Sequence, residues 1–154
     1  MGYRSEVGLM VIRDDKEAPS IPEVLAMAKA KGILADDTFD KYYDGNDYGW
    51  DDDRFLLYLE WTKWYESFPE VKAVMDLYAF FEELNRDEEG DERKWFSGRY
   101  VRCGEESNDN EETAFGDGWD IQSIGFMRRV YVDDQLGLLG SETLKTPEEH
   151  PAAN

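Results

Sequence analysis

Carboxylates dominate the residues of this chain that could do chemistry, beside one histidine and one cysteine. His150 lies between Glu149 and Pro151, where nothing orients an imidazole for acid–base work. Cys103 has no second cysteine to pair with, which excludes an intrachain disulfide and a CxxC-type zinc site. Its place in a strand-like run predicts a small buried side chain. The sequence therefore predicts neither a Ser-His-Asp nor a Cys-His mechanism.

One acidic stretch is similar to the beginning of a calcium-binding EF-hand loop. Asp44, Asn46 and Gly49 fit its first, third and sixth positions, but Tyr48 and Phe55 stand at the fifth and twelfth. The twelfth position requires a bidentate glutamate, so the match fails there. Acids are so numerous that chance alone produces the carboxylate pairs of a glycosidase or a two-metal nuclease. We predict no catalytic residue, no metal centre and no cofactor, and keep a carboxylate-cluster metal-dependent factor or enzyme as an alternative.

The charge of the chain favours a binding function over a catalytic one. Its 154 residues include 17 Lys and Arg against 36 Asp and Glu, a formal net charge of −19. This sign disfavours direct binding to DNA, RNA or anionic lipid, which present phosphates to cations. Apolar residues make up 41% and aromatic residues 14%, too much for a disordered acidic tail. The length fits one domain.

The acids are gathered in three blocks, at residues 36–53, 82–92 and 105–120. Aromatic residues interrupt the first block, and such rings need a surface to pack on, so it is either folded onto the domain or directed at a partner. A charged surface that only keeps the protein in solution is the plain alternative. As partner-binding residues we predict Asp36, Asp37, Asp40, Tyr43, Asp44, Asp47, Tyr48, Trp50, Asp51, Asp52, Asp53, Glu105, Glu106, Asp109, Glu111 and Glu112.

Hydrophobic periodicity predicts the elements that must position these side chains. Alternation and aromatic content predict four strands, at about residues 3–13, 55–64, 94–104 and 121–132. Periodicity of 3.6 predicts helices at about 21–31 and 68–85. Each helix follows an S-x-x-E capping box, Ser20 with Glu23 and Ser67 with Glu70.

This order predicts an α+β fold in a single domain over residues 1–133. We expect a four-stranded, mainly antiparallel sheet with both helices packed on one face, related to the ferredoxin-like arrangement, and acidic loops. Residues 134–154 are predicted as a C-terminal tail that is partly frayed. The N-terminal residues lack the apolar core of a secretion signal, and no run approaches a membrane span, so we expect a cytoplasmic location.

Four motifs carry a resemblance over most of the chain: MGYRSEV (1–7), KWYESFPEV (63–71), YVRCGEESNDNEE (100–112) and IGFMRRVYV (124–132). They resemble a group of short acidic proteins of tailed bacteriophages that open MGYRSDV and carry KWY-(D/E)-x-(F/Y)-P and R-x-G-E-(D/E). This chain departs from the group in its longer acidic segment 36–53 and in Cys103, where an aliphatic residue is usual. The resemblance implies a phage origin and an infected bacterial cytoplasm, and carries over no catalytic residues.

The acidic blocks and the resemblance predict a non-enzymatic inhibitor of a host protein. Its target is a nucleic-acid-handling or defence protein with a basic surface, occupied by partial DNA mimicry of an anti-CRISPR or anti-restriction type. We expect no direct contact with nucleic acid or membrane. A structural or regulatory phage protein that forms a homodimer through a sheet edge or an aromatic face is a further alternative.

Overall fold

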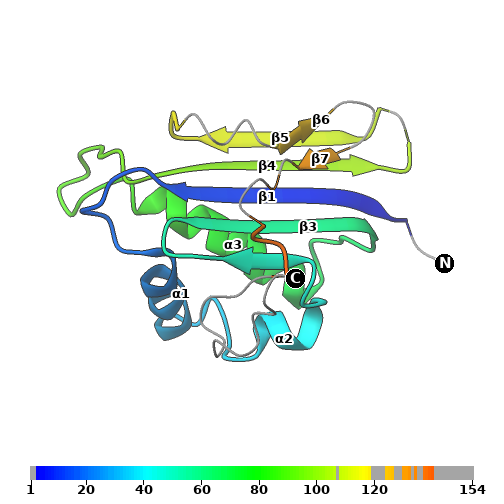
Figure 1. Cartoon of the computed structure of the whole chain (residues 1–154), viewed down its shortest axis with the longest axis horizontal. Coiled ribbons are helices and arrows are strands. Elements are labelled where there is room, and N and C mark those ends of the chain that lie inside the picture. Colours follow the sequence, from blue (N-terminus) through cyan, green and yellow to red (C-terminus); the bar gives the residue numbers. More distant parts are fainter. Residues whose placement is uncertain are drawn as a thin grey trace.

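The central element of the fold is an antiparallel sheet of five strands in the order β2-β3-β1-β4-β5 (Figure 1). The computed structural model describes residues 3–106, 108–118, 124–126, 130–132, 134 and 137–140. The sheet strands are β1 (Ser5–Arg13), β2 (Tyr48–Trp50), β3 (Arg54–Thr62), β4 (Phe96–Gly104) and β5 (Asn110–Phe115). The helices are α1 (Ile21–Ala30), α2 (Thr38–Tyr42) and α3 (Pro69–Glu83), and a separate pair is formed by β6 (Ile124–Phe126) and β7 (Val130–Val132).

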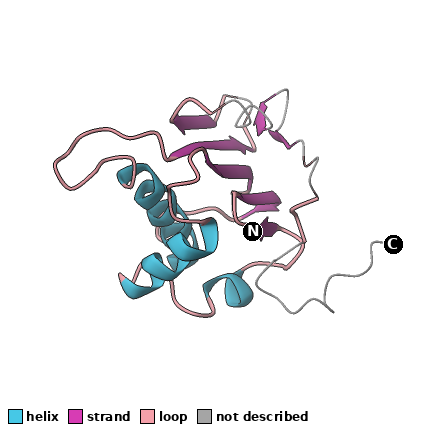
Figure 2. Ribbon diagram, turned by 60° about the vertical axis from the view of Figure 1, so that its left-hand side comes forward, coloured by secondary structure: helices cyan, strands magenta, loops and turns pink. Residues whose placement is uncertain are grey.

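Strand β1 lies at the centre of the sheet and is buried on both faces. Its alternation divides its apolar side chains between two hydrophobic clusters, as the sequence predicted. Val7, Leu9 and Val11 pack against the helices, whereas Met10 and Ile12 face the opposite side. Figure 2 shows the three helices gathered on one side of the strands.

The helix ends follow two different rules. Helix α1 begins with the predicted capping box: the Glu23 N–H donates to Ser20 Oγ at 3.3 Å, and the Ser20 N–H donates to Glu23 Oε1 at 2.9 Å. The predicted box before α3 is wrong, because its N-cap is Phe68 and no side chain caps it. Pro69 is the first residue of α3, where its fixed φ favours a helix start and its missing N–H costs nothing.

The acidic segment between α1 and β3 is folded onto the domain by its aromatic rings. Phe39 of α2 lies 5.1 Å from the ring of Tyr48 and 5.7 Å from that of Phe55, between ring centroids. Trp50 stacks between Tyr48 at 5.7 Å and Phe55 at 6.1 Å. These contacts attach α2 and β2 to the helix-covered face, and leave the acids of the segment to the outside.

The second face of the sheet is covered in part by chain that follows β5. Leu138 is 4% exposed and packs with Met10 and Ile12, and Asp134 holds this turn by accepting the Leu138 N–H at 2.7 Å. The Gly140 N–H then donates to the carbonyl oxygen of Tyr48 at 3.2 Å. Asp134 and residues 137–140 of the predicted tail 134–154 are thus packed on the sheet, and the rest of that tail lies outside the described residues.

Three elements were not predicted, so the expected sheet of four strands is corrected to five. β5, α2 and β2 all lie in segments that the sequence predicted to be acidic loops. Helix α2 is a third helix on the face of the sheet that α1 and α3 cover. The predicted strand 121–132 is wrong as one strand, because the described parts of it form β6 and β7, which pair with each other. The ferredoxin-like relationship is not confirmed.

Candidate partner-binding surfaces

The predicted partner-binding acids lie at opposite edges of the sheet, since β2 and β5 are its two edge strands. One group, here the α2 surface, surrounds α2 and the start of β2; the other, here the β5 surface, lies on the β4–β5 hairpin. The structure therefore does not bring them into one patch. The α2 surface comprises Asp36, Asp37, Asp40, Asp44 and Asp47. The β5 surface comprises Glu105, Glu106, Asp109, Glu111 and Glu112.

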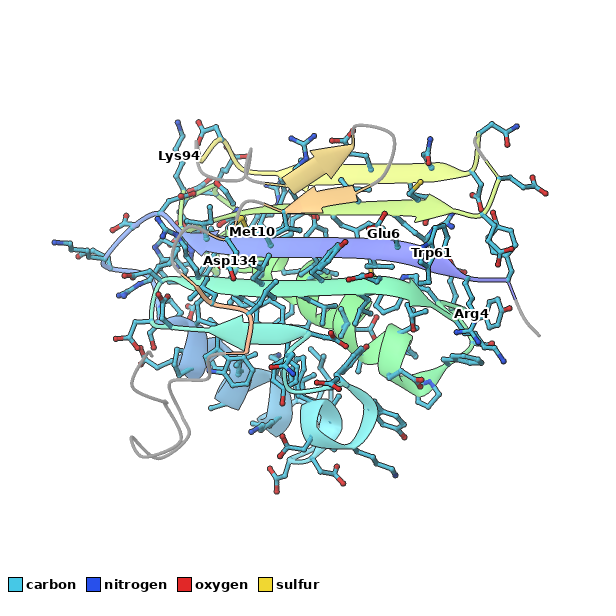
Figure 3. The ribbon with its side chains drawn as sticks, turned by 45° about the vertical axis from the view of Figure 1, so that its right-hand side comes forward. Arg4, Glu6, Met10, Trp61, Lys94 and Asp134 are labelled. Atoms are coloured by element: carbon cyan, nitrogen blue, oxygen red, sulfur yellow. The ribbon has the colours of Figure 1, made fainter. Side chains whose placement is uncertain are left out.

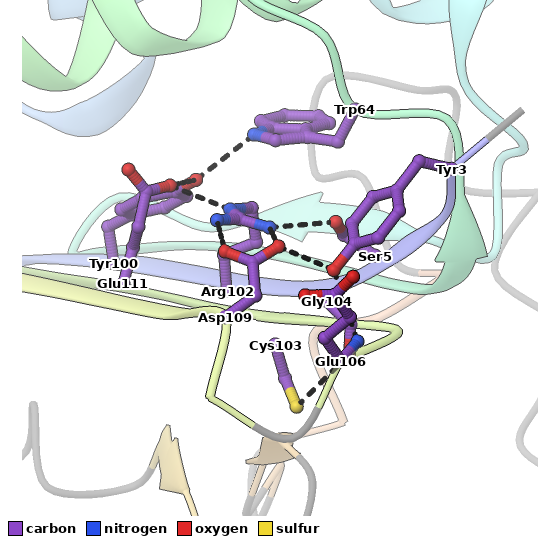
Figure 4. Close-up of polar contacts among 10 residues, drawn as sticks. All are labelled: Tyr3, Ser5, Trp64, Tyr100, Arg102, Cys103, Gly104, Glu106, Asp109 and Glu111. Atoms are coloured by element: carbon purple, nitrogen blue, oxygen red, sulfur yellow. Dashed lines mark hydrogen bonds and ion pairs between the residues drawn. The ribbon is translucent and has the colours of Figure 1, made fainter.

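Two arginines of β4 form ion pairs with three of the five acids of the β5 surface, and Figure 4 shows the pairs made by Arg102. Arg102 Nη2 lies 2.6 Å from Asp109 Oδ1, and Arg102 Nε lies 2.7 Å from Glu111 Oε1. Glu111 stands directly opposite Arg102 in the β4–β5 register, so the strand pairing itself creates this ion pair. Arg99 pairs with Glu112 in the same hairpin. The guanidinium groups hold these carboxylates in place.

Hydrogen bonds from the N-terminal segment reach the side chains of Asp109 and Glu105 and the backbone of Glu106. The Tyr3 hydroxyl donates to Asp109 Oδ2 at 2.6 Å and accepts the Glu106 N–H at 3.1 Å, while the Arg4 N–H donates to Glu105 Oε2. The Arg102 guanidinium, followed by Tyr3, lowers the pKa of Asp109 to about 2. These contacts therefore connect the residues just before β1 to the β4–β5 hairpin.

The α2 surface has no such cations. Across the ranges that the structure describes, none of its five carboxylates lies within 4.0 Å of a Lys or Arg nitrogen. Asp40 accepts the Tyr48 hydroxyl at 3.1 Å, and Asp44 accepts the Asn46 N–H at 2.9 Å. Lys41, the only basic residue of segment 36–53, lies with its Nζ 5.2 Å from the ring centroid of Tyr42. The negative charge there is thus not neutralised within the described chain.

Asp47 is the member of the α2 surface that the fold disfavours most as an anion. Burial raises its pKa, and the neighbouring charges of Asp44 and Glu60 raise it further. Glu60 was not among the predicted site residues. It lies on β3 two residues after Tyr58, whose N–H donates to the Asp47 carbonyl oxygen at 2.8 Å.

The acids at residues 51–53 form the turn between β2 and β3. Asp51 Oδ1 accepts the N–H groups of Asp53 at 2.9 Å and of Arg54 at 2.8 Å. Asp53 pairs with Arg13 at 3.3 Å, and the Asp52 carbonyl oxygen accepts the Ile21 N–H at 2.9 Å. These predicted contact residues connect β2 to β3 at the end of β2 away from Asp47, and their hydrogen bonds and ion pair are structural.

The aromatic part of the predicted site is wrong for two residues. Tyr48 is 2% exposed and Trp50 is 4% exposed, so neither can contact a partner; their rings fill the core beside Phe39. Tyr43 is half-buried and its hydroxyl donates to the Glu70 carbonyl oxygen at 2.8 Å. The exposed aromatics here are Tyr42 and Trp61, which no sequence pattern distinguished from core residues.

A groove of about 500 Å³ opens beside β3, lined by Asn46, Asp47 and residues 58–62. We call it the β3 edge groove. Strand β2 begins at Tyr48, which pairs with Leu57, whereas β3 continues five residues further to Thr62 without β2 beside it. In the described part of the chain, the β3 segment from Leu59 to Thr62 therefore has β1 as its neighbour on one side and the groove on the other.

Other candidate chemistry can be placed as well. Cys103 is 8% exposed and packs with Met10 and Val101 on the second face, as a small buried side chain. Over the described residues no three His, Cys, Asp or Glu side chains converge in a way that would hold a metal ion. His150 lies outside those residues.

Comparison with known proteins gives no match to any family model, curated protein or solved structure. Helix α3, with 15 residues, is the longest of the described helices, and none of them has both the length and the apolar character needed to span a bilayer.

Proposed function

We propose that this protein is a phage-encoded, non-enzymatic binding protein that inhibits a host nucleic-acid-handling or defence protein. The α2 surface occupies the basic groove in which that partner holds nucleic acid, which is partial DNA mimicry. The observation that carries the proposal is the absence of ion-pair partners for the five α2-surface carboxylates within the described chain. An anionic surface of this kind attracts a cationic partner and raises its association rate.

The contrast between the two edges supports this choice of surface. Both groups are clustered acids, yet Arg99 and Arg102 form ion pairs with Asp109, Glu111 and Glu112 of the β5 surface. Carboxylates that already bind arginine would have to break those contacts to bind a partner. The α2 surface can bind a cation without such a loss, and Asp36 and Asp37 are exposed.

A salt-dependent capture experiment tests the proposal. The tagged protein is incubated with lysate of its bacterial host, and retained proteins are challenged with duplex DNA. We expect retention of a protein that duplex DNA displaces and that is lost between about 50 mM and about 500 mM NaCl, because screening weakens exposed charge pairs. Its contact residues are tested by the triple variant Asp36→Asn, Asp37→Asn, Asp40→Asn.

The matched control removes three charges from elsewhere on the surface, by Glu66→Gln, Glu88→Gln and Glu89→Gln. These glutamates are exposed and distant in sequence from α2. The α2 variant is expected to lose the partner and the control to keep it. Equal retention by both variants, or a partner indifferent to DNA, would overturn the proposal.

A further inference from the structure

The β3 edge groove lies where strand β2 would run if it were longer. Strand β2 has three residues and β3 has nine. A tight turn diverts the chain just before β2, with the Asp47 N–H donating to the Asp44 carbonyl oxygen at 2.9 Å. The position next to the second half of β3 is left as a hollow of about 500 Å³.

The backbone of Glu60 points into this hollow. In an antiparallel sheet, alternate residues direct their N–H and C=O groups to opposite neighbours. The Tyr58 N–H bonds outward to Asp47, so Glu60, two residues further, also faces outward. Leu59 pairs with Val7 of β1, and the register shifts before Thr62 pairs with Ser5, so Glu60 and Trp61 lie at a β-bulge. Such an edge is a template for an added strand.

The side chains around this edge select a cation. Asp47 and Glu60 line the groove, and burial, followed by the charges of Asp44 and Glu60, raises the pKa of Asp47. Trp61, 38% exposed, adds an aromatic surface at the end of the strand, where Arg4 Nη1 lies 3.5 Å from its carbonyl oxygen (Figure 3). The carboxylates of Asp47 and Glu60 suit a lysine or arginine side chain.

We propose that an extended, lysine- or arginine-bearing segment of a partner protein adds to β3 as a strand and fills the β3 edge groove. This inference rests on the proposed function and states how that partner is held. Main-chain bonds to Glu60 supply the docking geometry, and the carboxylates supply the preference for cations. A second copy of this chain is disfavoured as the occupant, because a two-fold contact would place Asp47 and Glu60 against their own counterparts.

The probe is a fluorescent peptide library of about eight residues, the length of an ordinary strand, with lysine at alternate positions and Val or Thr between. A second library has the same side chains with every backbone nitrogen methylated, and a third has glutamate in place of lysine. Binding is measured by fluorescence anisotropy at about 50 mM NaCl, with backbone hydrogen exchange of Glu60 as a direct readout. We expect only the unmethylated lysine library to bind and to slow exchange at Glu60.

Two variants locate the contact. Glu60→Pro removes the outward N–H, and we expect an affinity loss of about tenfold or more. Glu60→Gln keeps the backbone and removes the charge, so a several-fold loss is expected without a change of fold, while Glu88→Gln should bind like the wild type. Equal binding of the methylated library, or no binding of the lysine library up to about 1 mM, would overturn the proposal. A dimer in light scattering that Glu60→Pro abolishes would assign the edge to a second copy instead.

Failure of this inference can be separated from failure of the proposed function. A partner captured through the α2 surface, together with a lysine library that does not bind, would reject the edge pairing alone. A library that binds through Glu60, together with no DNA-displaced partner, would reject the proposed inhibition alone.

Discussion

The nearest cation decides whether a carboxylate of this protein is structural or available for binding. Asp109 lies against Arg102 and Tyr3, which lower its pKa, whereas burial, followed by the charges of Asp44 and Glu60, raises the pKa of Asp47. The two residues are the same in type and come from similar acidic stretches. Their environments assign Asp109 to the stability of the β4–β5 hairpin and leave Asp47 strained as an anion at neutral pH.

Asp109→Asn should therefore destabilise the protein in a pH-dependent way. The lowered pKa means that the carboxylate stabilises the fold above its ordinary pKa near 3.9, and that this contribution is lost as the pH falls toward about 2. At pH 7 we expect the melting temperature to fall by about 2–4 °C, followed by circular dichroism. The difference from wild type should shrink between about pH 4 and about pH 2. A difference that stays constant over that range would contradict the assignment, and Glu88→Gln serves as the control.

Asp47→Asn should have the opposite effect on stability. For an acid with a raised pKa, the favourable contribution is complete below the ordinary pKa and is lost as the pH rises through the pKa of the folded state. We expect the variant to melt about 1–2 °C higher at pH 7 and to match the wild type below about pH 4. Asp52→Asn, an exposed neighbour in sequence, is the control. A less stable Asp47→Asn protein would show that the carboxylate is structural.

At the scale of elements, the sheet edges explain which parts of the fold could be predicted from the sequence. The alternation of β1 and the capping box of α1 are strong local signals, and both are confirmed. Strand β5 carries exposed residues from Asn110 to Ala114, so hydrophobic periodicity could not reveal it. Arg102 of β4 stands opposite Glu111 of β5, a favourable pair that is visible only once the register is known.

The candidate site was predicted only in part for the same reason. Acid clustering located both surfaces, but the sequence could not say that Arg99 and Arg102 cross to one of them. Tyr48 and Trp50 read equally well as partner anchors or as core, since an aromatic residue among acids has no period that distinguishes the two. Glu60 was missed because its importance comes from the short length of β2, a tertiary feature.

The pairing of β4 with β5 depends on a glycine under an aromatic ring. Gly98 stands opposite Phe115, and a Cβ added to Gly98 would lie 2.3 Å from Phe115 Cε1. Gly98→Ala should therefore cost about 1–3 kcal/mol of unfolding free energy by overpacking, measured by urea unfolding. Phe115→Leu in the Gly98→Ala background should restore part of that loss, because the two sites are coupled. Additive losses in the double variant would show that the ring does not contact residue 98.

The net charge of −19 acts on the whole molecule in two opposing ways. Like charges repel one another in the folded chain, which lowers stability, while the same field attracts a cationic partner. Arg99 and Arg102 of β4 reduce the repulsion at the β5 edge, whereas the α2-surface carboxylates have no ion pair among the described residues. Selection for solubility alone would be satisfied by acids spread evenly over the exterior. Their unequal neutralisation fits a surface reserved for binding.

Salt should consequently move stability and binding in opposite directions. Raising NaCl from about 0.1 M to about 1 M shortens the Debye length from about 10 Å to about 3 Å, which screens repulsion among the α2-surface acids and attraction to a cation alike. We expect the melting temperature of the protein to rise while the affinity for the lysine library falls. The variant Asp36→Asn, Asp37→Asn, Asp40→Asn should show a smaller rise, because it has lost part of the repulsion, whereas the variant neutralised at Glu66, Glu88 and Glu89 keeps the clustered charge. If both triple variants respond to salt like the wild type, the repulsion is not concentrated at the α2 surface, and the argument for binding there fails with it.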